Sequence, residues 1–258
     1  LDGVISNPED ERVYGERTNR DVVMDNVLAD LDFAIANLGA SSDRTQSSKD
    51  MALAMKSDIC LYEGTFRKYC SATENGPGLD PKPERAKKYL EESVKASQAL
   101  MGGTYSLSAK YGDIYNALNL SGNKEIIFYR HYEKDLVMNS IVDYCCGSTE
   151  QRGVTKDAFD AFLFKDGKPL ATTTCDKSDL AVKNAAGSYS IRKVLENRDP
   201  RLSVLIDSIV CFKGHTWKRP APEASGGALM SSSTGYTVKK YDNTSLEAFY
   251  RTNTYTGY

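Results

Sequence analysis

The chain has 258 residues, a length that suits one large domain or two small ones. Hydrophobic residues make up 40% of it and charged residues 26%, as in an ordinary globular protein. The formal net charge is −2 and there is no long basic run. This argues against nucleic acid or an anionic membrane as the main partner, because neutralising phosphates requires a positive surface.

The sequence shows neither a membrane span nor a metal site. No run of about 18 apolar residues is present, so no transmembrane helix is expected. The six cysteines and two histidines have no metal-ligand spacing, and we expect neither a metal nor another cofactor. The chain opens at Leu1 without a signal segment and stops at Tyr258 after a tyrosine-rich stretch. We therefore expect it to be a piece of a longer polypeptide.

Three long helices are predicted in the first part of the chain, over residues 19–38, 49–70 and 84–101. Apolar residues recur in each at spacings of three and four, the period of one helical face. Gly39 suits the end of the first helix, and Gly102 the end of the third. Helices of this kind cannot bury their apolar faces alone, so we expect them to pack antiparallel in sequence order, as in helical repeat proteins.

The middle helix carries the stripe that we expect at the centre of this packing. Its predicted buried face consists of residues spaced by three and four: Ala52, Met55, Ile59, Tyr62, Phe66 and Tyr69. Leu90 and Val94 belong to the matching stripe of the third helix. We therefore expect Ile59, Tyr62 and Leu90 to be buried between the helices.

After residue 107 the periodicity weakens and the predicted elements become short. They are a helix near 111–118, a strand over 125–132, a helix within 154–167, a helix and a strand on either side of an Asp-Pro break within 188–210, and a strand over 234–242. The segments 133–153 and 213–235 are polar or rich in glycine and proline, and are predicted to be loops.

These elements predict a mainly α fold with an irregular, loop-rich second part and a few short strands. No linker is visible, so we expect one domain over residues 1–258. Its helical scaffold is expected at 17–130 and its irregular part at 131–258.

No catalytic constellation is visible. The motifs G-x-x-x-x-G-K, G-x-S-x-G and H-E-x-x-H are all absent. Asp157 and Asp160 lie on one predicted helix and are interpreted as a solvated face, because paired glycosidase carboxylates normally come from different elements. Adjacent Cys145 and Cys146 form at best a strained bridge. Arg198 is interpreted as a partner in a buried ion pair. We therefore predict that the protein is not an enzyme.

Aromatic residues in the predicted loops are the candidate ligand-binding residues, because no helical stripe accounts for them. One set flanks the loop 133–153 and the other surrounds the single tryptophan: His131, Tyr132, Tyr144, His215, Trp217 and Arg219. A flat ring beside hydrogen-bonding groups is the combination that binds a pyranose. The alternative, that these rings cover the helical core, stays open.

Taken in order, the motifs of the chain resemble those of the SusD/RagB family. The series begins with R-T-N-R-D-V-V-M-D-N-V-L-A-D-L-D-F-A-I-A-N-L, S-K-D-M-A-L-A-M-K-S-D-I-C-L-Y-E-G, and E-R-A-K-K-Y-L-E-E-S through G-G-T-Y-S-L. It continues with K-E-I-I-F, V-T-K-D-A-F-D-A-F with D-G-K, N-R-D-P-R-L and T-G-Y-T-V-K-K-Y. The resemblance spans Arg17 to Tyr241 and covers the middle portion of a family member.

The resemblance implies a scaffold of tetratricopeptide-like helical hairpins, an irregular ligand-binding face and no enzyme activity. Members of the family bind glycans at the cell surface of Bacteroidota-type bacteria. They are lipoproteins of the outer membrane and sit on a SusC-like, TonB-dependent transporter. The expected function is therefore capture of an oligosaccharide and its delivery to such a transporter, with the lipid anchor in a segment before Leu1.

Two other functions are compatible with parts of the sequence. The first is a helical-repeat scaffold that binds peptides or proteins, since some family members are thought to serve peptide uptake. The second is a glycan-cleaving enzyme, which requires a facing pair of carboxylates that the sequence does not reveal. The family's sugar-contacting residues have no fixed motif, so the six candidate residues rest on their chemistry alone.

Overall fold

The computed structural model describes residues 3–69, 82–115, 117, 119–132, 136–137, 153–181, 188–211, 217–218, 229–230 and 232–240. The chain divides into two compact units, Leu1–Tyr105 and Ser106–Tyr258. Each unit is described by itself, and the expectation of a single domain stays a prediction. None of the described helices is long and apolar enough to cross a membrane.

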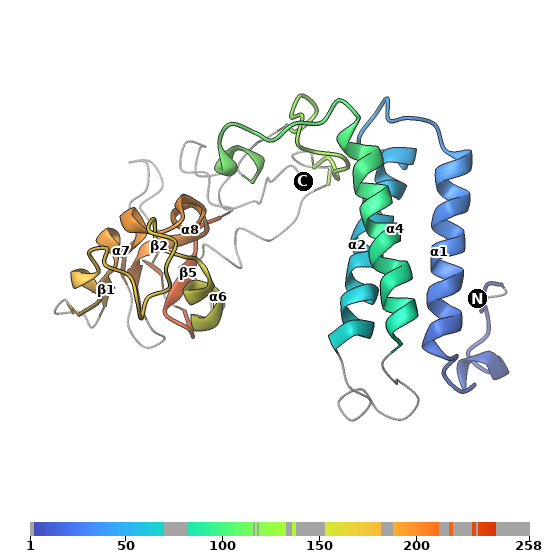
Figure 1. The fold of residues 1–258 in the computed structure, drawn as a ribbon, viewed down its shortest axis with the longest axis horizontal. Helices are drawn as coiled ribbons and strands as arrows, with labels where there is room; N and C mark the ends of the chain where they lie inside the picture. The colour runs from blue at the N-terminus through green and yellow to red at the C-terminus, as the bar shows by residue number, and fades with distance from the viewer. Residues whose placement is uncertain are drawn as a thin grey trace. The chain divides into compact units, whose positions relative to one another are not determined.

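The first unit consists of three long helices that lie side by side and alternate in direction (Figure 1). After a short 3-10 helix, η1 (Glu11–Val13), come α1 (Arg20–Asn37), α2 (Lys49–Tyr69) and α4 (Pro83–Met101). The three predicted helices and their antiparallel order are confirmed, with described bounds that differ from the predicted ones by one residue at most. Asn19 caps α1, because its side-chain oxygen accepts a hydrogen bond of 2.8 Å from the backbone N–H of Asp21.

The buried face of α2 is not the predicted one. The buried residues of this helix are Ala52, Lys56, Cys60, Glu63, Gly64 and Arg67. Lys56, Cys60, Glu63 and Arg67 each follow a residue of the predicted stripe by one position, which turns the buried face by about 100°. The predicted burial of Tyr62 is wrong, since 63% of this residue is exposed. Ile59 and Leu90 are half-buried.

Charged side chains explain the different face, because α2 meets its neighbours through ion pairs. Glu63 is fully buried, and its carboxylate accepts from Nη2 of Arg20 at 2.6 Å and from Nε of Arg67 at 3.0 Å. Arg67 in turn pairs with Asp21 of α1. A carboxylate with these partners is satisfied without water, so a charged residue takes a place that the hydrophobic pattern assigns to an apolar one.

A second ion-pair group joins the middle of the three helices. Nζ of Lys56 lies 2.6 Å from Asp32 of α1 and 2.6 Å from Glu92 of α4. The apolar core between these groups is small, and Tyr89 at its centre has no exposed surface. The helices are therefore held together by a short apolar centre and by ion pairs on both sides of it.

The second unit is made of short elements. They are η2 (Tyr111–Ile114), α6 (Lys156–Ala161), η3 (Ser178–Ala181), β1 (Tyr189–Ser190), α7 (Arg192–Asn197), α8 (Pro200–Leu205), β2 (Ile206–Val210), β3 (Trp217–Lys218), β4 (Leu229–Met230) and β5 (Tyr236–Val238). Antiparallel pairing gives one sheet with the order β1-β2-β5 and a second one made of β3 and β4. In the first sheet Val210 faces Tyr189 on one side and Tyr236 on the other.

The predictions for this unit are confirmed in part. The break at Asp199 lies between α7 and α8, because Pro200 begins α8 and the side chain of Asp199 caps it. The strand predicted over 234–242 appears as β5. Residues 125–132, predicted as a strand, form no strand. Together with the three long helices, these elements make the fold mainly helical with few short strands, as predicted.

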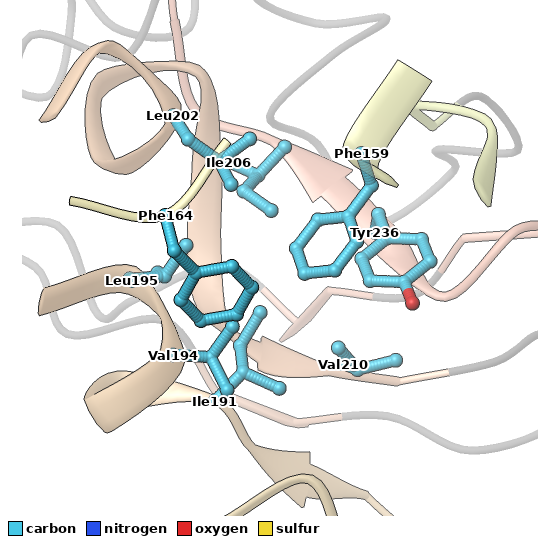
Figure 2. Packing of buried hydrophobic residues seen from close by; sticks show 9 residues of the cluster. All are labelled: Phe159, Phe164, Ile191, Val194, Leu195, Leu202, Ile206, Val210 and Tyr236. Carbon is cyan, nitrogen blue, oxygen red and sulfur yellow. The ribbon is translucent and has the colours of Figure 1, made fainter. Parts of the chain in front are cut away.

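The core of the second unit lies between the three-stranded sheet and the helices around it (Figure 2). Its buried members are Phe159, Phe164, Ile191, Val194, Leu195, Leu202, Ile206, Val210 and Tyr236. The rings of Phe159 and Tyr236 stack with centroids 4.5 Å apart. This contact joins α6 to the edge strand β5, and so ties together segments that are far apart in the sequence.

Arg198 is fully buried beside this core. Its Nη1 donates to the carbonyl oxygens of Phe159 and Phe162, both at 2.7 Å. Its guanidinium carbon lies 4.3 Å from the ring centroid of Phe159 and 4.5 Å from that of Phe164. The predicted carboxylate partner is present as Asp160, whose Oδ1 is 3.7 Å from Nη2. Burial lowers the pKa of Arg198, and the charge of Asp160 opposes this effect.

Candidate ligand-binding site

Two of the six candidate residues, His131 and Tyr132, have described side chains. Trp217 is described in its backbone alone, and Tyr144, His215 and Arg219 lie outside the described residues. The geometry of the candidate site is therefore built on the segment that contains His131 and Tyr132. Whether the other four join them stays a prediction.

The chain leading into this segment is held by hydrogen bonds to Ser108. The backbone N–H of Ser108 donates to Oε2 of Glu125 at 2.7 Å, and its hydroxyl donates to Oδ1 of Asn123 at 3.0 Å. The same Asn123 oxygen accepts from the backbone N–H of Glu125 at 2.9 Å. Residues 123–125 are thus attached to the neighbouring stretch, and the aromatic residues that follow start from a fixed point.

Side-chain contacts along the segment join residues two positions apart, as in an extended chain. Tyr129 is buried, and its ring meets the exposed His131 edge to face, with centroids 6.4 Å apart. The guanidinium of Arg130 lies 5.6 Å from the ring centroid of Tyr132. The buried ring of Tyr129 thus fixes the position of His131, and the guanidinium of Arg130 lies next to the half-buried ring of Tyr132.

The side chains of this segment are of the kinds that can contact a ligand. The ring of Tyr132 provides a flat apolar surface, Arg130 provides several hydrogen-bond donors, and His131 provides an imidazole. A pyranose has apolar C–H faces and a rim of hydroxyls, and a peptide has carbonyls and apolar side chains. The group can therefore bind either class of ligand by stacking and hydrogen bonding.

Arg130 was not among the predicted residues. It stands between Tyr129 and His131 in the run F-Y-R-H-Y, so the signal that could have found it is its place within an aromatic stretch. Its contact with Tyr132 joins residues two positions apart, and the strand predicted over 125–132 would also have placed them on one face.

The surroundings of Trp217 differ from the prediction. The segment 213–235 was predicted as a loop, but Trp217 lies in β3, opposite Met230 of β4, and Lys218 lies opposite Leu229. The expectation that Trp217 has no regular structure around it is therefore wrong. Its pairing partner comes from the same segment, whose glycines and prolines concealed two short strands.

The two carboxylates of α6 lie in different surroundings. Asp160 forms an ion pair with Lys156 of the same helix and faces buried Arg198, while Asp157 is exposed. Asp157 thus lies on a solvated face as expected, whereas Asp160 is half-buried; that neither is catalytic stays a prediction. Among the described residues no group of three or more histidine, cysteine or acidic side chains is placed to hold a metal ion.

Comparison with known proteins gives a similarity to a solved structure. No family model matches the sequence, and no curated protein matches it. Among solved structures, the chain is similar to a SusD superfamily protein from Bacteroides fragilis, with 15% sequence identity and a TM-score of 0.45. The match covers 95% of this chain and 45% of that protein, so the chain spans less than half of the protein's length.

Proposed function

We propose that this protein binds oligosaccharides at the cell surface without cleaving them and delivers them to a transporter. The observation that carries the proposal is the group formed by Arg130, His131 and Tyr132, in which a ring and hydrogen-bond donors lie together on an irregular segment. The ordered series of SusD/RagB-like motifs from Arg17 to Tyr241 supports it from the sequence.

In this proposal, a sugar ring stacks on Tyr132 and its hydroxyls accept hydrogen bonds from Arg130. Trp217 and Tyr144 supply further stacking surfaces, and His131, His215 and Arg219 supply further polar contacts. Stacking and a few hydrogen bonds to an open segment give modest affinity, because much of the interaction energy is offset by lost ligand freedom. Modest affinity suits a protein that has to release its ligand to a partner.

The proposal includes the location and the partner that the family resemblance implies. The protein is a lipoprotein of the outer membrane, exposed at the cell surface, and its partner is a SusC-like, TonB-dependent transporter. It uses no cofactor and no metal, and it has no enzyme activity.

A glycan array followed by titration calorimetry tests the proposal. The array identifies the best-bound oligosaccharide, and calorimetry then compares the wild type with Tyr132→Ala. Loss of one stacking ring should weaken binding by about 1–3 kcal/mol, roughly 5- to 150-fold. The matched control is Tyr14→Ala, which removes a tyrosine that is 72% exposed in the other unit and should leave affinity unchanged.

A second variant tests the part of Trp217, and other outcomes of these experiments would favour the alternative functions. Trp217→Ala should weaken the same binding by a similar amount while leaving the melting temperature nearly unchanged. An array without bound glycans, together with binding of unstructured peptides that depends on Tyr132, would favour the peptide-binding alternative. Sustained release of reducing ends by the purified protein would contradict the absence of enzyme activity.

A further inference from the structure

Arg130 is an exposed cation whose hydrogen-bonding groups are open toward solvent. Within the part of the chain that the structure describes, no carboxylate pairs with its guanidinium and none of its N–H groups donates a hydrogen bond. The guanidinium carbon lies 5.6 Å from the ring centroid of Tyr132. Open donors and a flat apolar surface therefore stand next to each other, at a spacing comparable to the width of one sugar ring.

This combination sets Arg130 apart from other arginines of the described segments. Several of them already pair with carboxylates: Arg12, Arg20, Arg67, Arg85, Arg198 and Arg201. Arg17 and Arg192 are exposed and form no ion pair among the described residues, but neither lies beside an aromatic ring there. Arg130 has both the open guanidinium and the ring.

The described segment around Arg130 contains little negative charge. Between residues 119 and 132 the acidic residue is Glu125, and its Oε2 accepts a hydrogen bond of 2.7 Å from the backbone N–H of Ser108. The exposed His131 adjoins Arg130 and adds an imidazole, whose ring meets Tyr129 edge to face. The carboxylate of Glu125 is thus engaged elsewhere, and the charge of Arg130 is available to a ligand.

A guanidinium with open donors beside a ring fits an acidic sugar better than a neutral one. Its planar fork of N–H groups matches the two oxygens of a carboxylate, and such charge-assisted hydrogen bonds are stronger than neutral ones. A uronic acid keeps the apolar C–H faces of a pyranose, so its ring can stack on Tyr132 while its carboxylate reaches Arg130. A neutral sugar can stack in the same way but supplies no counter-charge for Arg130.

We propose that the oligosaccharide is acidic, with carboxylates on its pyranose rings, and that Arg130 selects it by binding one of these carboxylates. Tyr132 supplies the stacking surface, and His131 adds a hydrogen bond to a neighbouring oxygen. The net charge of the chain is −2, so attraction of an anion has to come from a local cation. The inference rests on the proposed function, because it names the ligand class of the same site.

Titration calorimetry with paired ligands tests the inference on the full chain. Each pair is a short oligomer of galacturonic, glucuronic or mannuronic acid and its methyl ester, which keeps the sugars and linkages but removes the charge. At least one acid should bind about ten-fold or more tightly than its ester, because its carboxylate forms hydrogen bonds with a charged donor. Added salt should weaken binding of the acid and leave binding of the ester nearly unchanged.

Substitutions of Arg130 locate the selection. Arg130→Gln removes the charge and should lower the affinity for the acid by about ten-fold or more, to that of the ester. Arg130→Lys keeps the charge but not the fork, and should retain only part of the preference. The matched control is Arg192→Gln, which removes an exposed arginine without an ion pair among the described residues and should leave both affinities unchanged. The melting temperatures of all three variants should match that of the wild type, because both arginines are exposed.

The outcomes separate this inference from the proposed function. If a neutral oligosaccharide binds in a manner that depends on Tyr132, and no acid binds more tightly than its ester, the inference fails and the proposed function stands. A preference for acids that survives Arg130→Gln would overturn the role of Arg130. Tighter binding of a sulfated oligosaccharide than of any of the acids would overturn the assignment of a carboxylate. If no saccharide binds at all, the inference and the proposed function both fail.

Discussion

A β-carbon built on Gly64 would lie 2.7 Å from Cγ of Leu90, across the contact between α2 and α4. It would also lie 3.1 Å from the carbonyl oxygen of Ala86. The two helices therefore approach each other where α2 carries no side chain at all. This glycine sits inside a helix, where it costs about 1 kcal/mol relative to alanine, so close packing is the physical reason for its presence.

Gly64→Val should destabilise the protein by about 1–3 kcal/mol, because the added methyl groups force the helices apart. Urea denaturation followed by circular dichroism at the helix signal measures the change. In the double variant Gly64→Val/Leu90→Ala the clash is relieved, so the total loss should be smaller than the sum of the two single losses. Simple additivity would mean that the close approach does not limit stability.

Glu63→Gln should destabilise the protein by about 3–5 kcal/mol. It leaves Arg67, which is 3% exposed, as a buried cation with one partner fewer, and it weakens the link to Arg20. The matched control is Glu91→Gln, which removes an exposed carboxylate 4.0 Å from Lys87 and should change stability by less than about 0.5 kcal/mol. Equal losses for the two variants in urea denaturation would contradict a structural role of the buried pair.

Stability should fall when the pH is lowered below about 4. Burial alone would raise the pKa of Asp21, but its hydrogen bond from Lys82 and the charges of Arg67 and Arg85 outweigh burial and lower the pKa. The hydrogen bond from Arg85 is the main reason for the lowered pKa of Asp25. Because these pKa values are lower in the folded state, the unfolded state binds more protons. The stabilisation is thus complete above the unfolded value of about 3.9 and is lost below it.

Thermal unfolding between neutral pH and about pH 2 measures this dependence. Asp25→Asn should lower the melting temperature at neutral pH, and the difference from the wild type should shrink as the pH approaches the lower end. A difference that is independent of pH would show that Asp25 acts through packing instead of charge.

Arg198→Ala should destabilise the second unit by about 3–5 kcal/mol. The carbonyl oxygens of Phe159 and Phe162 would lose their donor, and the guanidinium would leave a cavity beside the rings. Arg201→Ala is the control, because its side chain is 58% exposed and pairs with Asp199 at the surface. This control should cost at most about 1 kcal/mol. A mild effect of Arg198→Ala would mean that the core closes around the missing side chain.

The surroundings of the candidate site could be predicted from the sequence only in part. Aromatic residues outside a helical stripe pointed to the segment of His131 and Tyr132, whose side chains are available for contact. The part played by Arg130 escaped prediction, because only aromatic and histidine residues of this stretch were singled out, although a strand would also place Arg130 beside Tyr132. The strand β3 around Trp217 escaped it as well, since two-residue strands leave no periodicity to detect.

The sequence by itself determined the number, order and bounds of the long helices, since a period of three to four residues, an Asn cap and terminal glycines are local signals. The Asp-Pro break between α7 and α8 is local in the same way. The tertiary structure alone decided which face of α2 is buried. Glu63 meets Arg20 across 43 positions of the chain, and this pairing makes burial of a carboxylate favourable while Tyr62 stays exposed. Hydrophobic periodicity is the spacing of residues that are ranked one by one by their hydrophobicity. It therefore carries no information on ion pairs between residues far apart in the chain. The buried face of a helix held by charges is therefore decided only when its partners are in place.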